Sequence, residues 1–255
     1  MRIATWNVNS IRARLKFVLH WLEARQPDVV CLQELKVTED TFPYSELEEL
    51  GYHACVEAQP RWNGVAVIAK TPPELIQAGL PAVRDQGARL VMAKVGDLHV
   101  ASAYVPNGKT VSHEDYPRKL AWLAALDEYV AELDLGDKVV IGGDFNVAPE
   151  PSDSFAPNDE TSIFHTAAER SAIARLRERG LHDLYRTRNP DGDMFSWWDY
   201  RAGHFHKNVG LRIDLLLASA SVLASTGEVW IDRDYRKKQD GETPSDHAPV
   251  IAELS

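Results

Sequence analysis

The chain has 255 residues, with 38 acidic against 28 basic side chains and a formal charge of -10 at pH 7. Hydrophobic residues make up 44% of the chain and charged residues 26%, a globular composition that excludes intrinsic disorder and a collagen-like structure. The excess of negative charge argues against a broad basic surface, so a polyanion would have to be met locally or through a metal ion.

The expected strands are short apolar runs rich in β-branched residues, a pattern typical of buried β-structure. In chain order they span residues 2–8, 29–32, 64–68, 90–95, 99–105, 138–142, 211–218 and 248–254. Apolar residues three and four positions apart predict helices at 11–24, 115–133 and 166–179, with Gly180 ending the last helix. Because strands outnumber helices, the pattern favours stacked sheets with helices on their outer faces over an alternating barrel.

The sequence predicts one domain without a membrane span or a disulfide framework. The polar stretches 149–159 and 235–244 are too short for interdomain linkers, so residues 1–255 are expected to form a single domain. The first 30 residues do not predict a secretion signal, and no apolar stretch approaches the roughly 18 residues that cross a membrane. Cys31 and Cys55 both lie in apolar runs, where a reduced thiol is the common state. A cytoplasmic protein is therefore expected.

Carboxylate and amide side chains recur at the ends of the expected strands. Asn7 and Asn9 close the first strand, Glu34 closes the second, and Asp144 and Asn146 follow a later one, while Asp246 stands with His247 just before the last strand. Any one of them alone is better explained as a turn or surface residue. Their recurrence at convergent strand ends instead indicates a site for Mg²⁺, which takes oxygen ligands, commonly one or two carboxylates together with phosphate and water.

Glu34 is the leading candidate ligand, because a glutamate at the end of an apolar strand has no role in packing. The alternative for Glu34 is a solvated ion pair with Lys36. Asp144 and Asn146 lie two residues apart, so in an extended backbone they point the same way and can orient a water molecule and hold a phosphate oxygen. The alternative for this pair is an Asx-turn after the two preceding glycines.

Asp214 lies in an otherwise apolar run and needs a partner, because a buried carboxylate is costly unless it is paired. His247 is the natural partner, since a carboxylate behind an imidazole fixes its tautomer and stabilises its protonated form. A pair with Arg212, two positions away on the same face, is an alternative that the spacing leaves open. Asp246, next to His247, is expected to point to the opposite face and to have a different role. Tyr104 ends another strand and can offer its hydroxyl to a phosphate, although aromatic strand ends more often pack.

Six segments together resemble the exodeoxyribonuclease III family of apurinic/apyrimidinic (AP) endonucleases, within the endonuclease/exonuclease/phosphatase superfamily. They are residues 5–13 (TWNVNSIRA), 32–36 (LQELK), 104–107 (YVPN), 143–146 (GDFN), 210–214 (GLRID) and 245–249 (SDHAP). Their order and rough spacing fit the family from one terminus to the other. The resemblance implies an α/β fold, a four-layer sandwich of two packed mixed β-sheets flanked by helices.

The resemblance also implies a role for each matching residue. The implied ligands of Mg²⁺, or of Mn²⁺ in its place, are Glu34, Asn7, Asp246, Asp144, Asn146 and His247. The implied catalytic residues, which align the attacking water or contact the scissile phosphate, are Tyr104, Asp144, Asn146, Asp214 and His247. The implied substrate contacts are Asn107, Lys36, Trp197 and Leu211. Of these, Trp197 and Leu211 fall where side chains wall the pocket for a flipped-out abasic sugar, whereas Trp198 is expected in the core.

Basic side chains gather in clusters despite the acidic background. The clusters are Arg175, Arg177 and Arg179; Arg201, Lys207 and Arg212; and Arg233, Arg236, Lys237 and Lys238. The first cluster lies on an expected helix and reads as a solvated face. Loop cations such as Arg201, Lys207 and Lys237 are expected to contact DNA phosphates, which predicts a locally basic rim around an acidic cleft.

The implied activity is that of a Mg²⁺-dependent DNA-repair nuclease. It would cut 5′ to abasic sites in duplex DNA, trim or unblock 3′ ends, and act as a monomer in base excision repair. Two alternatives are a phosphoesterase of the same superfamily acting on a lipid or inositol phosphate, and a noncatalytic DNA-binding protein. Ser10 stands where many members carry glycine, and residues 150–164 and His165 are less familiar, which leaves the balance between endonuclease and exonuclease activity open.

Overall fold

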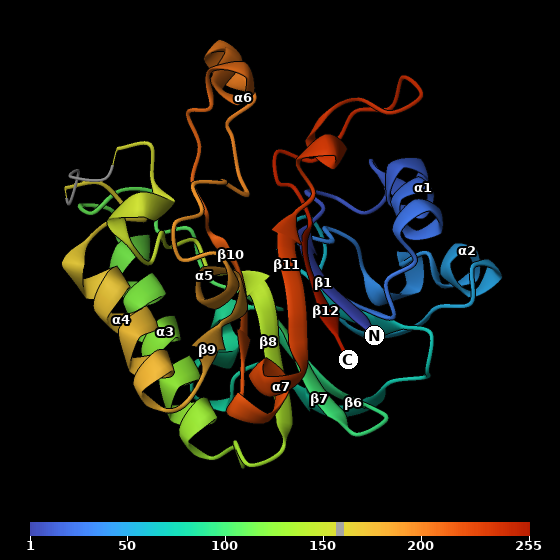
Figure 1. The fold of residues 1–255 in the computed structure, drawn as a ribbon, viewed down its shortest axis with the longest axis horizontal. Helices are drawn as coiled ribbons and strands as arrows, with labels where there is room; N and C mark the ends of the chain where they lie inside the picture. Colours follow the sequence, from blue (N-terminus) through green and yellow to red (C-terminus); the bar gives the residue numbers. More distant parts are fainter. Residues whose placement is uncertain (157–160) are drawn as a thin grey trace.

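The computed structural model describes residues 1–156 and 161–255. In this part of the chain twelve strands form two six-stranded sheets (Figure 1). The first sheet contains, in spatial order, β11 (Thr226–Ile231), β12 (Val250–Leu254), β1 (Arg2–Asn7), β2 (Val29–Gln33), β4 (Val65–Ala69) and β3 (His53–Glu57). The second contains β5 (Glu74–Ala78), β6 (Leu90–Val95), β7 (Leu98–Tyr104), β8 (Lys138–Asp144), β10 (Asp214–Ala218) and β9 (His182–Asp183). Both sheets are mixed, because β1 and β2 are parallel, as are β7 and β8, while their other neighbours are antiparallel.

The helices of the described residues are α1 (Leu15–Arg25), α2 (Tyr44–Glu49), α3 (Asp115–Ala131), α4 (Ala167–Glu178), α5 (Leu184–Arg188), α6 (His204–Lys207) and α7 (Ala220–Ser225). The first four of them cover the two outer faces of the sheets. Helices α1 and α2 pack on the first sheet through a cluster that includes Trp6 and Trp21. Helices α3 and α4 pack on the second through one that includes Trp122 and Ile173. The result is the four-layer α/β sandwich that the resemblance implies. The helices of the described residues are all too short or too polar to span a lipid bilayer.

The layer between the two sheets is apolar, and glycines allow β8 to lie close to its neighbours. A Cβ added at Gly142 would lie 3.0 Å from the Sγ of Cys31 on β2, and one added at Gly143 only 2.1 Å from the main-chain oxygen of Ala103 on β7. A side chain at Gly143 is therefore excluded by backbone. Both cysteines are free thiols, as expected, and Cys31 is buried while Cys55 is partly exposed.

All eight expected strands are present, with most boundaries within two residues of the expected ones and one shifted by three. Strand β10 begins at Asp214 rather than at residue 211, because Leu211 forms isolated bridges with Trp197 and Ser154 instead of continuing the ladder with β8. The strands β3, β5, β9 and β11 were not predicted. Strand β5 is a largely exposed edge strand and β9 has two residues, so neither produces an apolar run.

The three expected helices are also present. Helix α1 begins at Leu15, four residues after the expected start, because Ile11 lies in the preceding turn. Gly180 follows α4 with a φ of +107°, which confirms its role in ending that helix. The short helices α2, α5, α6 and α7 were not predicted, since a few residues are too short for a helical period to show.

Candidate active site

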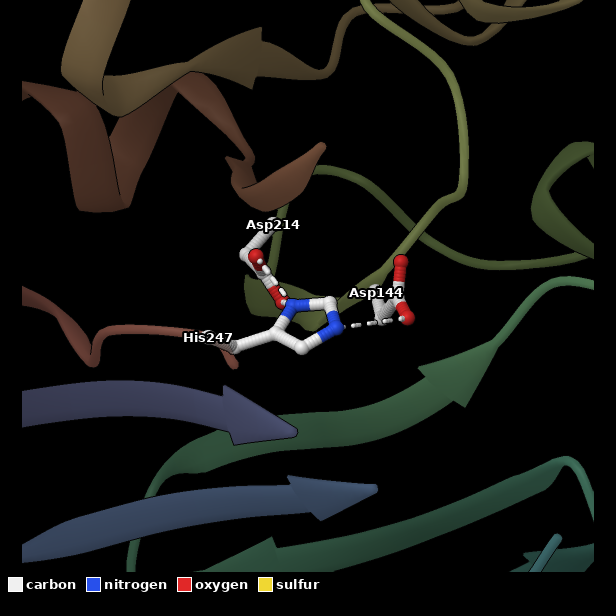
Figure 2. A group of neighbouring side chains, drawn as sticks. All are labelled: Asp144, Asp214 and His247. Atoms are coloured by element: carbon white, nitrogen blue, oxygen red, sulfur yellow. Dashed lines mark hydrogen bonds and ion pairs between the residues drawn. The ribbon is translucent and has the colours of Figure 1, made fainter. Parts of the chain in front are cut away.

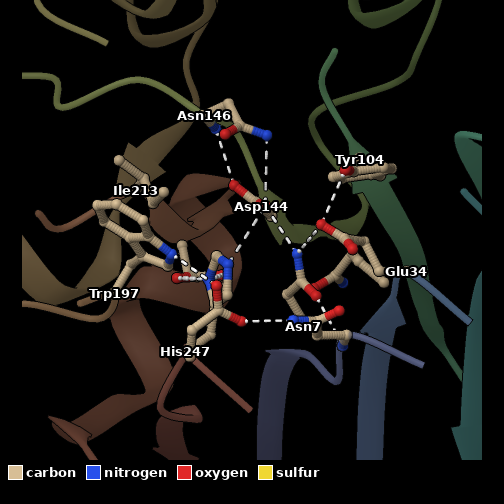
Figure 3. Close-up of polar contacts among 12 residues, drawn as sticks. Asn7, Glu34, Tyr104, Asp144, Asn146, Trp197, Ile213 and His247 are labelled. Carbon is tan, nitrogen blue, oxygen red and sulfur yellow. Dashed lines mark hydrogen bonds and ion pairs between the residues drawn. The ribbon is translucent and has the colours of Figure 1, made fainter. Parts of the chain in front are cut away.

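Polar side chains at or next to the ends of several strands meet at one edge of the sandwich (Figure 3). Asn7 ends β1, Tyr104 ends β7, Asp144 ends β8, and Glu34 directly follows β2. The parallel pairs β1–β2 and β7–β8 explain why these four ends lie together. Asp214 begins β10, but β10 runs antiparallel to β8 and aligns Asp214 with Asp144, so its start lies at the same edge.

His247 lies between two buried carboxylates (Figure 2). Its Nδ1 donates to Oδ2 of Asp214 at 2.9 Å, and its Nε2 lies 3.8 Å from Oδ2 of Asp144. The hydroxyl of Ser196 also donates to Asp214, at 2.6 Å. The structure therefore pairs Asp214 with the imidazole, and the other imidazole nitrogen faces Asp144.

Arg212, the alternative partner of Asp214, is fully buried and paired elsewhere. Its guanidinium donates to both carboxylate oxygens of Asp153, at 2.7 and 2.8 Å, and lies 2.8 Å from Asp183. The expectation that Arg212 belongs to a DNA-facing cluster is therefore wrong, because its guanidinium has no path to solvent. Its neighbours in the sequence gave no sign of this, since both acidic partners come from distant segments.

Glu34 is connected both to a lysine and to Asp144. The Nδ2 of Asn7 donates to Oε1 of Glu34 at 3.0 Å and to Oδ2 of Asp144 at 2.9 Å. Tyr104 donates its hydroxyl to Oε1 of Glu34 at 2.8 Å, and Nζ of Lys36 lies 2.7 Å from Oε2. The ion pair with Lys36 is thus present, but the shared amide of Asn7 also brings the Glu34 and Asp144 carboxylates side by side.

Asp246 and His247 have different partners, as their alternation along an extended segment predicts. Asp246 accepts a hydrogen bond from Nδ2 of Asn9 at 2.9 Å and one from the indole nitrogen of Trp197 at 3.0 Å. Arg236 donates to the main-chain oxygen of Asp246 at 3.1 Å. Asp246 therefore links the loop after β1 to the aromatic side of the site.

Asn146 and Asn107 complete the polar set beside Asp144. The main-chain nitrogen of Asn146 donates to Oδ1 of Asp144 at 2.9 Å, which is the Asx-turn considered above. The Nδ2 of Asn146 donates to Oδ2 of Asp144 at 3.3 Å, and Asn107 donates to Oδ1 of Asn146 at 3.2 Å. The turn and the site are therefore compatible, because the turn itself holds the amide of Asn146 beside the carboxylate.

Burial and charge crowding set the protonation states in this site. Burial raises the pKa of Asp144 to about 7, with help from the charge of Asp214 and against the pull of His247. Burial disfavours charge on His247, but the carboxylates of Asp214 and Asp144 outweigh it and raise the pKa of His247 to about 10. Burial also opposes ionisation of Glu34, but the charge of Lys36 and the hydrogen bonds from Asn7 and Lys36 together outweigh it and lower the pKa of Glu34. At neutral pH the site therefore contains an imidazolium and an ionised Glu34.

The donor set fits a hard divalent cation. The carboxylates of Glu34 and Asp144 converge on one amide nitrogen of Asn7, and the charge of Glu34 contributes to the raised pKa of Asp144. Asp144, Asp214 and His247 also form a group whose ligand atoms all lie within 4.8 Å of one another. A cation held by carboxylate oxygens would relieve this crowding, and Mg²⁺ prefers such ligands.

An apolar wall lies beside His247. The ring of Trp197 has its centroid 6.5 Å from that of His247 and 6.2 Å from that of Phe164. Leu211 is buried against this wall and exchanges main-chain hydrogen bonds with Trp197. Trp198 is fully buried, which confirms its expected place in the core.

His165 is buried next to the same wall. Its Nε2 lies 2.6 Å from Oγ of Ser154, so it contacts the loop that precedes α4. Of the less familiar segment 150–164, residues 157–160 lie outside the part of the chain that the structure describes.

The expected loop cations are exposed. Arg201 and Lys207 lie on the segment that carries α6, which projects away from the sandwich (Figure 1). The guanidinium of Arg201 donates to Asp199 at 2.6 Å. On α4, the guanidinium of Arg179 instead forms two hydrogen bonds with Asp127 of α3.

A groove beside the polar set was not predicted from the sequence. It has a volume of about 530 Å³, and its lining includes Trp62, Arg89, Tyr104, Asn107, Lys109 and Arg118. Trp62 is 67% exposed, an unusual state for so large an apolar side chain. Three separate segments build this groove, so no single stretch of sequence signals it.

Comparisons with known proteins agree with this fold and this site. The sequence pattern described as the endonuclease/exonuclease/phosphatase family matches residues 4–247. Exodeoxyribonuclease III of Haemophilus influenzae is 37% identical over 269 residues, covering 100% of both chains. The solved structure of the 3′ phosphatase NExo from Neisseria, bound to product DNA hairpin, is 36% identical with a TM-score of 0.95 and covers 100% of this chain and 99% of that one. An AP endonuclease from Archaeoglobus fulgidus is 34% identical with a TM-score of 0.94 over the same shares.

The chain therefore belongs to the endonuclease/exonuclease/phosphatase family. Within that family it is a DNA-repair nuclease of the exodeoxyribonuclease III and AP endonuclease type, a hydrolase of phosphodiester bonds.

Proposed function

We propose that this nuclease uses Mg²⁺ to cut duplex DNA 5′ to abasic sites and to remove nucleotides or blocking groups from 3′ ends, as a cytoplasmic monomer in base excision repair. The observation that carries the proposal is the convergence of the Glu34 and Asp144 carboxylates on Asn7, with a charged His247 beside them and an apolar wall next to it. The names of the relatives support both activities, since they include an AP endonuclease and a 3′ phosphatase.

Glu34, Asn7 and Asp246 would hold the Mg²⁺ ion, with Asp144 and Asn146 on the side of the phosphate. When bound, Mg²⁺ would supply positive charge that offsets the charge building on the phosphate and the leaving oxygen. His247 is assigned to the phosphate rather than to the metal, because its Nδ1 is taken by Asp214 and its raised pKa keeps the ring protonated.

Asp144 and Asn146 orient the attacking water. A carboxylate whose pKa lies near neutral is well matched to accepting a proton from that water as the new P–O bond forms and the P–O bond to the leaving 3′ oxygen breaks. The leaving oxygen then takes a proton from solvent. His247 donates from Nε2 to a nonbridging phosphate oxygen, and Asp214 holds the imidazole charged and oriented. Tyr104 and Asn107 offer further donors to the same phosphate.

Substrate selection follows from the apolar wall. An abasic nucleotide lacks its base, so turning it out of the helix costs less than turning out a normal nucleotide. The Trp197 ring, with Phe164 and the buried Leu211 behind it, offers an apolar surface for the bare sugar. Arg201, Lys207 and the cations of the groove, Lys109 and Arg118, would hold the flanking phosphates.

Removal of the metal is expected to abolish cleavage. A duplex with one abasic site, the same duplex without it, and a nicked duplex with a 3′-phosphate are each incubated with Mg²⁺, with EDTA, and with Mn²⁺ after EDTA. We expect a nick 5′ to the abasic site and release of the 3′-phosphate with Mg²⁺, no product with EDTA, and recovery with Mn²⁺. The rate ratio between the abasic and 3′-phosphate substrates gives the balance of the two activities. Hydrolysis of an inositol or lipid phosphate, with all three DNAs left intact, would contradict the proposed function.

The exposed cations of the α6 segment are expected to set the salt dependence of DNA binding. Replacing Arg201 or Lys207 by alanine removes one phosphate contact, so the slope of log affinity against log salt should fall by about 1 for each change. Fluorescence anisotropy of a labelled duplex over a salt series measures this slope. Lys94→Ala, an exposed cation on β6, is the control and should leave it unchanged. Equal slopes for all three variants would remove Arg201 and Lys207 from the DNA interface.

A further inference from the structure

An ion pair that the proposed chemistry does not use lies between α3 and α4. Lys119 of α3 and Glu169 of α4 are both 0% exposed, and their Nζ and Oε1 atoms are in direct contact. A buried pair of this kind contributes little to stability compared with apolar side chains of the same size, because both charges have lost their water. Its presence so close to the site calls for another role.

The lysine end of the pair holds the backbone of the active-site loop. Nζ of Lys119 donates to the main-chain oxygen of Asn146 at 2.6 Å. Asn146 has a φ of +49°, in the left-handed region that non-glycine residues seldom adopt. This conformation brings the Asn146 main-chain nitrogen to Asp144 and the side chain to Asn107. The hydrogen bond from the Lys119 ammonium to the Asn146 carbonyl therefore helps to hold this peptide in place. With it are held the Asn146 side chain and the neighbouring Asp144 carboxylate, which face the phosphate.

The glutamate end of the pair holds the wall of the pocket. Oε1 of Glu169 accepts from the main-chain nitrogen of Phe164 at 3.1 Å, and Oε2 accepts from that of Thr166 at 3.0 Å. The Phe164 ring lies over the ammonium of Lys119, 5.1 Å from its centroid, and 6.2 Å from the ring of Trp197. The same two side chains thus contact both the loop that carries Asn146 and the loop that carries the apolar wall.

We propose that Lys119 and Glu169 act as a positioning pair. By contacting both the Asn146 loop and the Phe164 loop, they fix the position of one loop relative to the other, so that the attacking water and the sugar are held at the same phosphate. Neither residue touches the substrate. The inference rests on the proposed function for the identity of that substrate, but the relative position of the two loops does not depend on it.

The chain offers a matched control. Asp127 and Arg179 also bridge α3 and α4, at the other end of the two helices, through two charge-assisted hydrogen bonds. The Asp127–Arg179 pair contacts neither loop. Breaking it therefore tests how far the packing of α3 on α4 alone affects the cleavage rate.

The test compares two double variants with the wild-type enzyme. Lys119→Met/Glu169→Gln removes both buried charges with little change in size, and Asp127→Asn/Arg179→Gln removes the control pair. We expect the first to lower kcat by about 100-fold with little change in KM, because a misplacement of about 1 Å near the reacting atoms has this effect. The control should keep the wild-type kcat, even where its Tm falls further than that of the first variant.

Each enzyme is assayed on the abasic duplex and on bis(4-nitrophenyl) phosphate, a small diester that tests the site whatever its natural substrate. If the proposed function is wrong, the wild-type enzyme will hydrolyse the small diester but not the abasic duplex. The ratio of variant to wild-type kcat on the small diester then still tests the positioning role. A wild-type kcat in Lys119→Met/Glu169→Gln, or an equal loss in the control, would overturn it. If the double variant does not fold, Glu169→Gln alone removes the negative charge and keeps one oxygen, which can accept from one of the two loop amides. For it, a kcat loss at constant KM supports the inference, and a wild-type kcat overturns it.

Discussion

Asp144→Asn is expected to lower kcat for DNA cleavage by about 10³-fold, the scale on which loss of a positioned acid–base group acts. The asparagine keeps the shape of the side chain, and its single oxygen can still accept from the Asn146 backbone, but it loses the second acceptor that faces Asn7 and cannot take the proton of the attacking water. KM for the duplex should change little, since the flanking phosphates are bound elsewhere. Steady-state cleavage of the abasic duplex, with substrate varied, separates the two constants.

The same substitution should not weaken the fold of the metal-free protein. Asp144 is 1% exposed and burial raises its pKa, so the cost of ionising it in the folded protein grows as the pH rises from the ordinary carboxyl pKa of about 3.9 to about 7 and is fully present above that. Thermal unfolding in EDTA should therefore show a Tm at or above that of the wild type at pH 8. Asp191→Asn, an exposed aspartate in a loop, is the control for both measurements. A cleavage rate within tenfold of the wild-type rate would show that Asp144 is not the proton acceptor.

Arg212→Met is expected to lower the free energy of unfolding by about 3–5 kcal/mol, because it leaves buried carboxylates without their counter-charge. The guanidinium pairs with Asp153 and Asp183, and Arg186 provides the other charged contact of Asp153. For a chain of this length the Tm should fall by about 10 °C. Urea denaturation and calorimetry measure the two quantities.

The pH dependence of this loss has a defined sign. Burial opposes ionisation of Asp153, but Arg212, with help from Arg186, outweighs it and lowers the pKa of Asp153 in the folded protein. The pair therefore stabilises the fold above the unfolded carboxyl pKa of about 3.9, and this contribution disappears as the pH falls through the folded value. The difference in the free energy of unfolding between Arg212→Met and the wild type should be largest near neutral pH and small in acid.

A surface ion pair provides the control for Arg212. Arg177 lies 3.0 Å from Glu150, and both side chains are partly exposed. Arg177→Met should cost less than about 1 kcal/mol, as solvated pairs do. Similar losses for Arg177→Met and Arg212→Met would contradict the view that burial makes the Arg212 network important.

The sequence predicted the central strands and the chemistry of the site for the same reason. Strands β2, β4 and β8 are covered on both faces, so they appear as continuous apolar runs. A carboxylate at the end of such a run, as at Glu34 or Asp144, has no packing role and stands out. Edge strands such as β5 and short helices such as α6 left no such signal.

Partner choice could not be predicted, because it depends on contacts between distant segments. From the spacing alone, Asp214 had two candidate partners, His247 and Arg212. Only the packing of the sheets brings Asp214 to His247 and Arg212 to Asp153.

By itself, then, the sequence determined which residue types end the strands of this nuclease, and so the class of chemistry at that edge. Local backbone periodicity and apolar runs are encoded in neighbouring residues, which is why they can be read directly. Only the tertiary structure decided which charges are buried and paired, how the Lys119–Glu169 pair joins two loops, and where the groove beside Trp62 lies. Those features arise from side chains far apart in the chain, and their energies depend on the water that packing removes.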